Sequence, residues 1–220
     1  MTPVVVAMTG ASGAIYGARL LQVLLAKGTY VHCVMSDSGK QVLKQELKID
    51  LSDLPTDDSH DSQLFLQRLT EHEWLDTPER QAAGQWAGER LQLFDNDDFL
   101  APMASGSHLT AGMVVCPCSG STLSGIACGR SGNLIQRAAE VHLKERRKLL
   151  LVTRETPLSQ VNLQNQLQVT QAGGVILPAS PGWYHGVGQL LDLVDFVVAR
   201  ILDQLGQHHD LMRRWGGSDQ

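Results

Sequence analysis

Short apolar runs alternate along the chain with segments in which apolar residues recur at helical spacing. Apolar runs typical of strands buried on both faces of a parallel sheet occur at 4–8, 30–35, 113–116, 149–153 and 175–177. Amphipathic segments predict helices at 41–47, 119–126, 134–146, 161–171 and 190–205, and a further helix from Ile15 to a stop at Gly28. The alternation predicts an α/β fold: a Rossmann-like three-layer domain with a central parallel sheet.

Residues 50–100 break this pattern, because they hold thirteen Asp and Glu against three Arg. We interpret them as an irregular, partly helical excursion with a weak strand at 91–94, and most of their charges as a solvated acidic surface. The chain shows no internal repeat and no low-complexity linker. Its 220 residues suit one buried core, so a single domain over 1–220 is expected.

Composition and charge exclude several classes of protein. A net charge of −5 makes general nucleic-acid binding unfavourable, because that binding neutralises phosphates with Lys and Arg. The N-terminus lacks a basic region and a signal-peptide core, and no apolar stretch approaches the roughly 20 residues of a membrane span. A cytoplasmic protein is expected. Reduced thiols are expected at the four Cys, and the spacing of Cys116 and Cys118 does not match a zinc site.

Candidate chemistry gathers where the predicted strands end, which is where ligands bind in open parallel sheets. Glycines, hydroxyl residues and one cation follow the runs, at Gly10, Ala11, Ser12, Gly13, Ser36, Ser119, Gly120, Ser121, Thr122 and Arg154. Backbone N–H groups, hydroxyls and a guanidinium suit a phosphate. For the glycine motif alone, a tight turn without a ligand remains an alternative.

A basic cluster lies further along the chain. Arg137 and Lys144 are seven residues apart and share one helix face, with Glu140 between them. With Arg154 they could bind an anionic group of a substrate, although a salt-bridged surface helix explains Arg137 and Lys144 equally well. We assign the adjacent residues Arg146, Arg147 and Lys148 to the surface.

Two carboxylates and several aromatic residues complete the candidates. Glu155 stands beside Arg154 at a strand end, where a base would be useful, whereas Glu46 by pattern alone is a solvated helix residue. Trp183 and Tyr184 follow a Pro-Gly pair in a predicted loop, and Trp215 lies in the C-terminal tail. Aromatic residues in such places can enclose an apolar ligand or stabilise a cation.

Seven motifs occur in order along nearly the whole chain. They read Thr-Gly-Ala-Ser-Gly-Ala-Ile-Tyr-Gly at 9–17, Cys-Pro-Cys-Ser at 116–119, Asn-Leu-Ile-Gln-Arg-Ala-Ala at 133–139, Leu-Lys-Glu-Arg-Arg at 143–147, Arg-Glu-Thr-Pro at 154–157, Gly-Gly-Val-Ile at 173–176 and Pro-Gly-Trp-Tyr-His at 181–185. Together they resemble the flavin prenyltransferases of the UbiX type. The sequence departs from that family's usual residues at Gly120, Ser121 and Gly132 and at 164–166.

The resemblance implies a reaction. A dimethylallyl group passes from dimethylallyl phosphate to N5 and C6 of reduced FMN, without a metal. The product, prenylated FMN, is the cofactor of a UbiD-type decarboxylase. The resemblance also implies a homo-oligomer, a dodecamer, with sites at subunit interfaces.

The resemblance also assigns roles to matching positions. FMN would be held by Gly10, Ala11, Ser12, Ser36, Ser119, Gly120, Ser121, Thr122 and Arg154. The substrate phosphate would be bound or protonated by Arg137, Lys144, Glu155, Tyr184 and Arg200. Ser12 would steer N5, and Glu46 and Trp215 would lie near the prenyl group.

Two other functions remain open. One is an FMN-dependent cysteine decarboxylase of the phosphopantothenoylcysteine type, although the catalytic His expected early in that chain is missing. The other is a flavin carrier without catalysis, which would not need Arg137, Lys144, Tyr184 and Arg200 as a second phosphate site.

Overall fold

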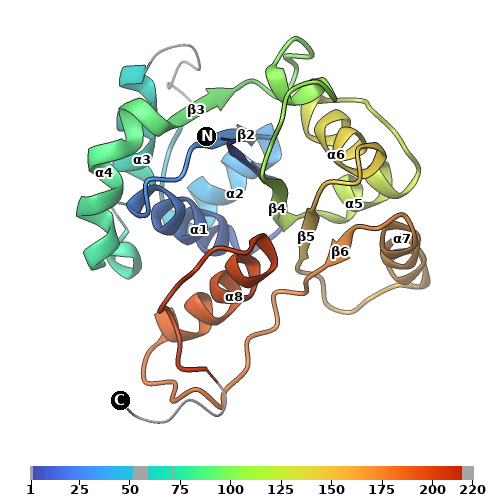
Figure 1. The fold of residues 1–220 in the computed structure, drawn as a ribbon. Coiled ribbons are helices and arrows are strands. Elements are labelled where there is room, and N and C mark those ends of the chain that lie inside the picture. The colour runs from blue at the N-terminus through green and yellow to red at the C-terminus, as the bar shows by residue number, and fades with distance from the viewer. Residues whose placement is uncertain (1, 52–58, 71, 215–220) are drawn as a thin grey trace.

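The computed structural model of the protein describes residues 2–51, 59–70 and 72–214, and its centre is one six-stranded sheet (Figure 1). All neighbouring strands pair in parallel, in the order β3-β2-β1-β4-β5-β6. The strands are β1 Val4–Met8, β2 Val31–Met35, β3 Leu91–Phe94, β4 Gly112–Cys118, β5 Leu149–Thr153 and β6 Val175–Ile176. The predicted central parallel sheet is confirmed.

Helices cover both faces of the sheet. They are α1 Ala14–Ala26, α2 Asp37–Leu47, α3 Ser59–Leu69, α4 Pro78–Arg90, α5 Gly120–Ala127, α6 Leu134–Lys144, α7 Gln160–Gln171 and α8 Leu190–Leu205, with 3-10 turns η1 Glu73–Leu75 and η2 Pro102–Ala104. Successive side chains of β1 point to opposite faces. Val4 and Val6 join a core with α1 and α8, whereas Val5 and Ala7 join a second core with α5 and α6. The three-layer prediction is therefore confirmed.

The acidic segment is more regular than its sequence suggests. The strand at 91–94 is confirmed as the edge strand β3, but α3 and α4 replace most of the predicted irregular excursion. Helix α4 packs against α1 and buries only the small residues Ala83 and Ala87. Two alanines give a faint apolar pattern, so periodicity alone could not reveal this helix.

The cysteines are free thiols, as predicted. Cys33, Cys116 and Cys118 are buried and Cys128 is exposed. Burial raises the pKa of the Cys33 thiol to about 12. In the part of the chain that the structure describes, no three His, Cys, Asp or Glu side chains cluster closely enough to hold a metal ion. Within the same residues, no helix has the length and apolar character needed to cross a bilayer.

A pair of stacked histidines is expected to make stability depend on pH. His32 on β2 stacks on His108, with ring centroids 5.3 Å apart. Burial and the neighbouring His108 lower the pKa of His32 from 6.5 to about 4. The unfolded chain therefore takes up more protons than the native protein between these pH values. We expect the free energy of unfolding to fall as pH drops from 6.5 towards 4, by at most about 1.4 kcal/mol per pH unit and by less where solvent reaches the ring.

Urea unfolding at pH 7 and pH 5 tests this expectation. His32→Gln should flatten the pH dependence relative to the unchanged protein, because it removes the titrating group. Equal pH slopes in both proteins would show that His32 does not govern acid stability.

Candidate functional site

The loops after β1, β2 and β4 meet at the carboxyl edge of the sheet. Strands β2 and β3 follow β1 on one side of the sheet, and β5 and β6 follow β4 on the other, so the strand order reverses between β1 and β4. Open α/β sheets bind ligands at such a switch point, at the carboxyl ends of the strands. The N–H of Ser36 donates to the carbonyl of Met8 over 3.1 Å. The N–H of Ser119 donates to Oγ1 of Thr9 over 2.8 Å. These bonds hold the candidate residues of three loops side by side.

Two glycines determine the conformation of the loop that follows β1. Gly13, the N-cap of α1, has a φ of 104°, a left-handed conformation that side chains disfavour. At Gly10 a Cβ would lie 2.6 Å from Cβ of Ser38, so only glycine allows the loop after β1 to approach the first turn of α2 so closely. Ser12 lies between these two glycines and is exposed.

Glu46 of α2 lies against the start of α1, directly after the glycine loop. Its carboxylate accepts hydrogen bonds from the N–H groups of Gly13 and Ala14, each at 3.0 Å. A carboxylate at a helix N-terminus is favoured by the helix dipole. Glu46 therefore fixes the end of the loop that carries Ser12, a role that the sequence pattern alone had disfavoured.

Three hydroxyl groups gather at the start of α5. Oγ of Ser119 accepts from the N–H of Thr122 over 3.3 Å, and it lies 3.1 Å from Oγ of Ser121 and 3.0 Å from Oγ1 of Thr122. Ser121 is exposed, whereas Ser119 and Thr122 are buried. Hydroxyl donors at a helix N-terminus suit a phosphate group.

The segment after β5 also reaches the carboxyl edge of the sheet. Nε of Arg154 donates to the carbonyl of Ser12 over 3.3 Å, which brings a cation to the glycine loop. The exposed Glu155 lies beside the start of α5, with Oε2 4.0 Å from where a Cβ of Gly120 would stand. The hydroxyls, the helix N-terminus and Arg154 together fit a flavin mononucleotide phosphate, and the open glycine loop leaves room for a ring.

The basic residues of α6 have partners on their own side of the molecule. Arg137 donates from Nε to the carbonyl of Ala104 over 3.1 Å, and its NH1 group lies 2.8 Å from Oε2 of Glu140. Hydrogen bonds from Ser131 and Arg137 lower the pKa of Glu140. Lys144 pairs with Glu145, not with Glu140. In the single chain, α6 is therefore a salt-bridged surface helix, which is the alternative that the sequence had left open for Arg137 and Lys144.

Tyr184 and Arg200 lie on the opposite face of the sheet. The ring of Tyr184 packs edge-on against Phe196 of α8, with centroids 5.8 Å apart, and Arg200 pairs with Asp203 over 2.8 Å. Helix α8 belongs to the core with α1, whereas α6 belongs to the core with α5. One chain therefore does not bring Arg137 and Lys144 together with Tyr184 and Arg200. Trp215 lies outside the described residues.

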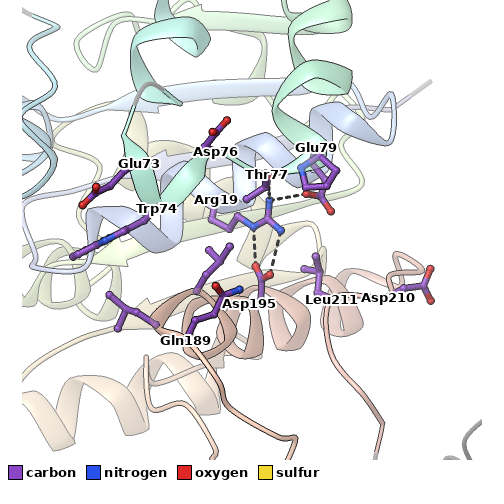
Figure 2. A pocket seen from close by; sticks show the side chains of 13 residues that line it. Arg19, Glu73, Trp74, Asp76, Thr77, Glu79, Gln189, Asp195, Asp210 and Leu211 are labelled. Atoms are coloured by element: carbon purple, nitrogen blue, oxygen red, sulfur yellow. Dashed lines mark hydrogen bonds and ion pairs between the residues drawn. The ribbon is translucent and has the colours of Figure 1, made fainter.

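A separate pocket of about 560 Å³ lies between α1, α8 and the segment from η1 to the start of α4 (Figure 2). Arg19, a buried residue of α1, lines this pocket. Its guanidinium donates to Asp195 over 2.7 Å and to Glu79 over 3.1 Å. Burial raises the pKa of Asp195, although Arg19 opposes that effect. Of the sequence-predicted residues that the structure describes, none lines this pocket. The sequence signal that could have indicated this pocket is Arg19, a charged residue within the otherwise apolar stretch 18–21.

Comparisons with known proteins agree with this geometry. The Flavoprotein family model matches residues 1–202. The flavin prenyltransferase UbiX of Halalkalibacterium halodurans is 46% identical over 211 residues, which cover 96% of this chain and 92% of the relative.

Two solved structures share the whole fold. AnUbiX, solved in complex with FMN and dimethylallyl pyrophosphate, gives a TM-score of 0.80 at 36% identity over 99% of both chains. A dodecameric FMN-dependent UbiX-like decarboxylase from Escherichia coli gives 0.78 at 35% identity, over 98% of this chain and 100% of the other. The chain therefore belongs to the flavoprotein family and, within it, to the UbiX flavin prenyltransferases.

Proposed function

We propose that this protein is a cytoplasmic prenyltransferase, a single flavin-binding domain over 1–220. It joins the dimethylallyl group of dimethylallyl phosphate to N5 and C6 of reduced FMN and supplies the product to a UbiD-type decarboxylase. The observation that carries the proposal is the meeting of phosphate-binding groups from four loops at the switch point of the sheet. No metal takes part.

The first phosphate site would hold FMN. Ser36, Ser119, Ser121 and Thr122 supply hydroxyls, Gly10, Ala11 and Gly120 supply backbone, and Arg154 supplies the charge. Ser12, on the exposed part of the glycine loop, would direct its hydroxyl to N5. Glu46 holds the N–H groups of Gly13 and Ala14 and so anchors the chain directly after Ser12.

The second phosphate site would bind the leaving group. When phosphate departs from an allylic carbon, negative charge grows on its oxygens while the carbon becomes cationic. Arg137, Lys144 and Arg200 would stabilise that anion, and Tyr184 would donate a hydrogen bond to it. The indole of Trp215 would stabilise the cation. The released phosphate, or Glu155, would accept the proton that leaves C6 as the ring becomes aromatic again.

The two halves of this second site would come from different copies of the chain. Tyr184 follows β6 and so lies towards the carboxyl edge, whereas Lys144 is in the last turn of α6, five residues before β5 begins. We therefore propose a homo-oligomer, a dodecamer like the Escherichia coli neighbour, in which a second copy supplies Arg137 and Lys144.

Anaerobic incubation with reduced FMN tests the function. Dimethylallyl phosphate and dimethylallyl pyrophosphate are supplied in separate reactions, and the recovered flavin is examined by mass and spectrum. We expect a gain of one prenyl unit with at least one donor. Unmodified FMN from both reactions would contradict the proposal and favour the cysteine decarboxylase or the flavin carrier.

Ser12→Ala tests the residue that we assign to N5. Losing one hydrogen bond is expected to slow prenylation about tenfold while FMN binding is retained. Ser107→Ala is the matched control, because Ser107 is also exposed in a loop and its hydrogen bonds among the described residues stay within its own turn, with Ser105. A full prenylation rate in Ser12→Ala would remove that role.

A further inference from the structure

The carboxylate of Asp203, in the last turn of α8, holds two arginines and a histidine. Its Oδ2 accepts from NH1 of Arg200 over 2.8 Å, and its Oδ1 accepts from NH2 of Arg214 over 2.9 Å. Nε2 of His209 lies 3.1 Å from the same Oδ1. Burial opposes the ionisation of Asp203, but hydrogen bonds from Arg214 and His209 outweigh it and lower the pKa of the carboxyl. We define these four residues as the Asp203 cluster.

His209 fixes the cluster from inside the protein. Its side chain is only 1% exposed. A carboxylate only accepts hydrogen bonds, so Nε2 carries a proton and donates it to Asp203. Nδ1 is buried and has no hydrogen-bond partner among the described residues. The bond to Asp203 is therefore the polar contact that orients His209 and, in return, the carboxylate.

A reversal of the chain after α8 brings Arg214 to Asp203. Gly206 ends α8 with a φ of 69°, a left-handed conformation that suits glycine. The N–H of Gln207 donates to the carbonyl of Leu202 over 2.9 Å, so the chain turns back along the helix. Arg214 thus meets Asp203 across eleven residues.

The cluster carries a surplus of positive charge, because two guanidinium groups share one carboxylate. Each guanidinium has five N–H donors, and its bond to Asp203 uses one of them. Both side chains are about half exposed, 48% for Arg200 and 58% for Arg214. The pair is therefore suited to bind an anion, and the planar fork of an arginine matches phosphate in particular.

The same side of α8 carries residues already assigned to the prenyl donor. Phe196, Arg200 and Asp203 follow one another at spacings of four and three residues, which places them along one side of the helix. The ring of Tyr184 packs on Phe196, with centroids 5.8 Å apart. The Asp203 cluster therefore continues, within one chain, the line that begins at Tyr184.

We propose that Asp203 is a positioning residue, which holds Arg200 and Arg214 as a pair for the phosphate of the prenyl donor. Arg214 is then a further substrate-binding residue, and it directly precedes Trp215, which we assign to the allylic cation. The identity of the anion rests on the proposed prenyl transfer. The pairing of the two arginines by Asp203 does not.

Inorganic pyrophosphate titrated into the FMN-loaded protein tests Arg214 as a ligand of the anion. Arg214→Met should weaken pyrophosphate binding at least about tenfold and lower kcat/KM for dimethylallyl phosphate by a similar factor, because a charge-assisted hydrogen bond is lost. Arg213→Met is the matched control: it removes the same charge from the adjacent exposed residue and should leave both values unchanged. Unchanged binding in Arg214→Met, or equal losses in the two variants, would overturn the role of Arg214.

Asp203→Asn separates positioning from net charge. The side chain keeps nearly the same size, but the cluster becomes more positive. Charge alone would strengthen the binding of pyrophosphate, whereas the loss of positioning weakens it. We expect binding to weaken at least about fivefold and kcat/KM to fall at least about tenfold. Binding that is unchanged or tighter would overturn positioning by Asp203.

Two substitutions of His209 test the same contact from the other side. The amide of His209→Gln can donate to Asp203 in place of Nε2, whereas His209→Leu cannot. At equal folded fraction, His209→Gln should keep most of the prenylation rate and His209→Leu should lose about tenfold. Equal rates in the two variants would show that this bond does not position the arginines.

Circular dichroism and thermal unfolding establish which variants fold. If Asp203→Asn does not fold, Asp203→Glu takes its place in the titration, because it keeps the charge but moves the carboxylate, and unchanged binding would again contradict positioning. If the unchanged protein binds pyrophosphate but does not prenylate FMN, the proposed function fails, whereas the titrations still decide the arginine pair.

Discussion

Arg137→Met is expected to lower kcat/KM for prenyl transfer by about 10²–10³-fold, with FMN binding unchanged. The guanidinium is held at Nε by the carbonyl of Ala104 and at NH1 by Glu140. Two fixed contacts leave its remaining N–H groups oriented for an anion. Steady-state kinetics with dimethylallyl phosphate measure the loss, and flavin titration measures the binding.

Glu140→Gln tests how Arg137 is held. The amide keeps the size of the side chain but removes the charge that pairs with NH1, so a smaller loss than in Arg137→Met is expected, chiefly in kcat. Arg146→Met is the control, because Arg146 is an exposed cation just after the same helix. Equal losses in Arg146→Met and Arg137→Met would show that net charge, not the position of Arg137, governs the rate.

Asp195→Ala is expected to lower the free energy of unfolding by about 3–5 kcal/mol, because it leaves the buried Arg19 without its main partner. The Arg19 side chain is only 3% exposed, and both oxygens of Asp195 accept from it, at 2.7 and 3.1 Å (Figure 2). This pair joins α1 to α8. Urea unfolding followed by circular dichroism measures the loss.

The double variant Arg19→Met with Asp195→Leu provides the comparison. Replacing both charges with apolar side chains leaves no unpaired ion, so the double variant should be more stable than Asp195→Ala. A double variant that is less stable than the single one would show that the ion pair stabilises the fold beyond the cost of its desolvation.

Some of the candidate site was predictable because it is local. Ser36 and Ser119 directly follow apolar strands, and parallel strands place their carboxyl ends at one edge of a sheet. Hydroxyls and glycines at those ends therefore had to gather once the strands were recognised. Arg154 follows β5 for the same reason, and its hydrogen bond to Ser12 agrees with that prediction.

Other features depend on contacts between distant segments. Glu46 looks like any exposed helix residue until α2 places it at the start of α1, 33 residues earlier in the chain. Arg19 meets Asp195 across 176 residues, and no spacing in the sequence announces that pair. Helix α4 packs through two alanines, which carry almost no periodic signal.

The sequence by itself determined the parallel sheet, the covering helices and the gathering of glycine and hydroxyl loops at one edge of the sheet, because each follows from local apolar patterns and strand ends. Only the tertiary structure decided which face each helix covers, and so which charged side chains can meet. The family resemblance had assigned Arg137 and Arg200 to one anion. Their helices pack on opposite sides of the sheet, since the face that a helix covers is set by how the chain crosses over the sheet and not by the helix's own residues.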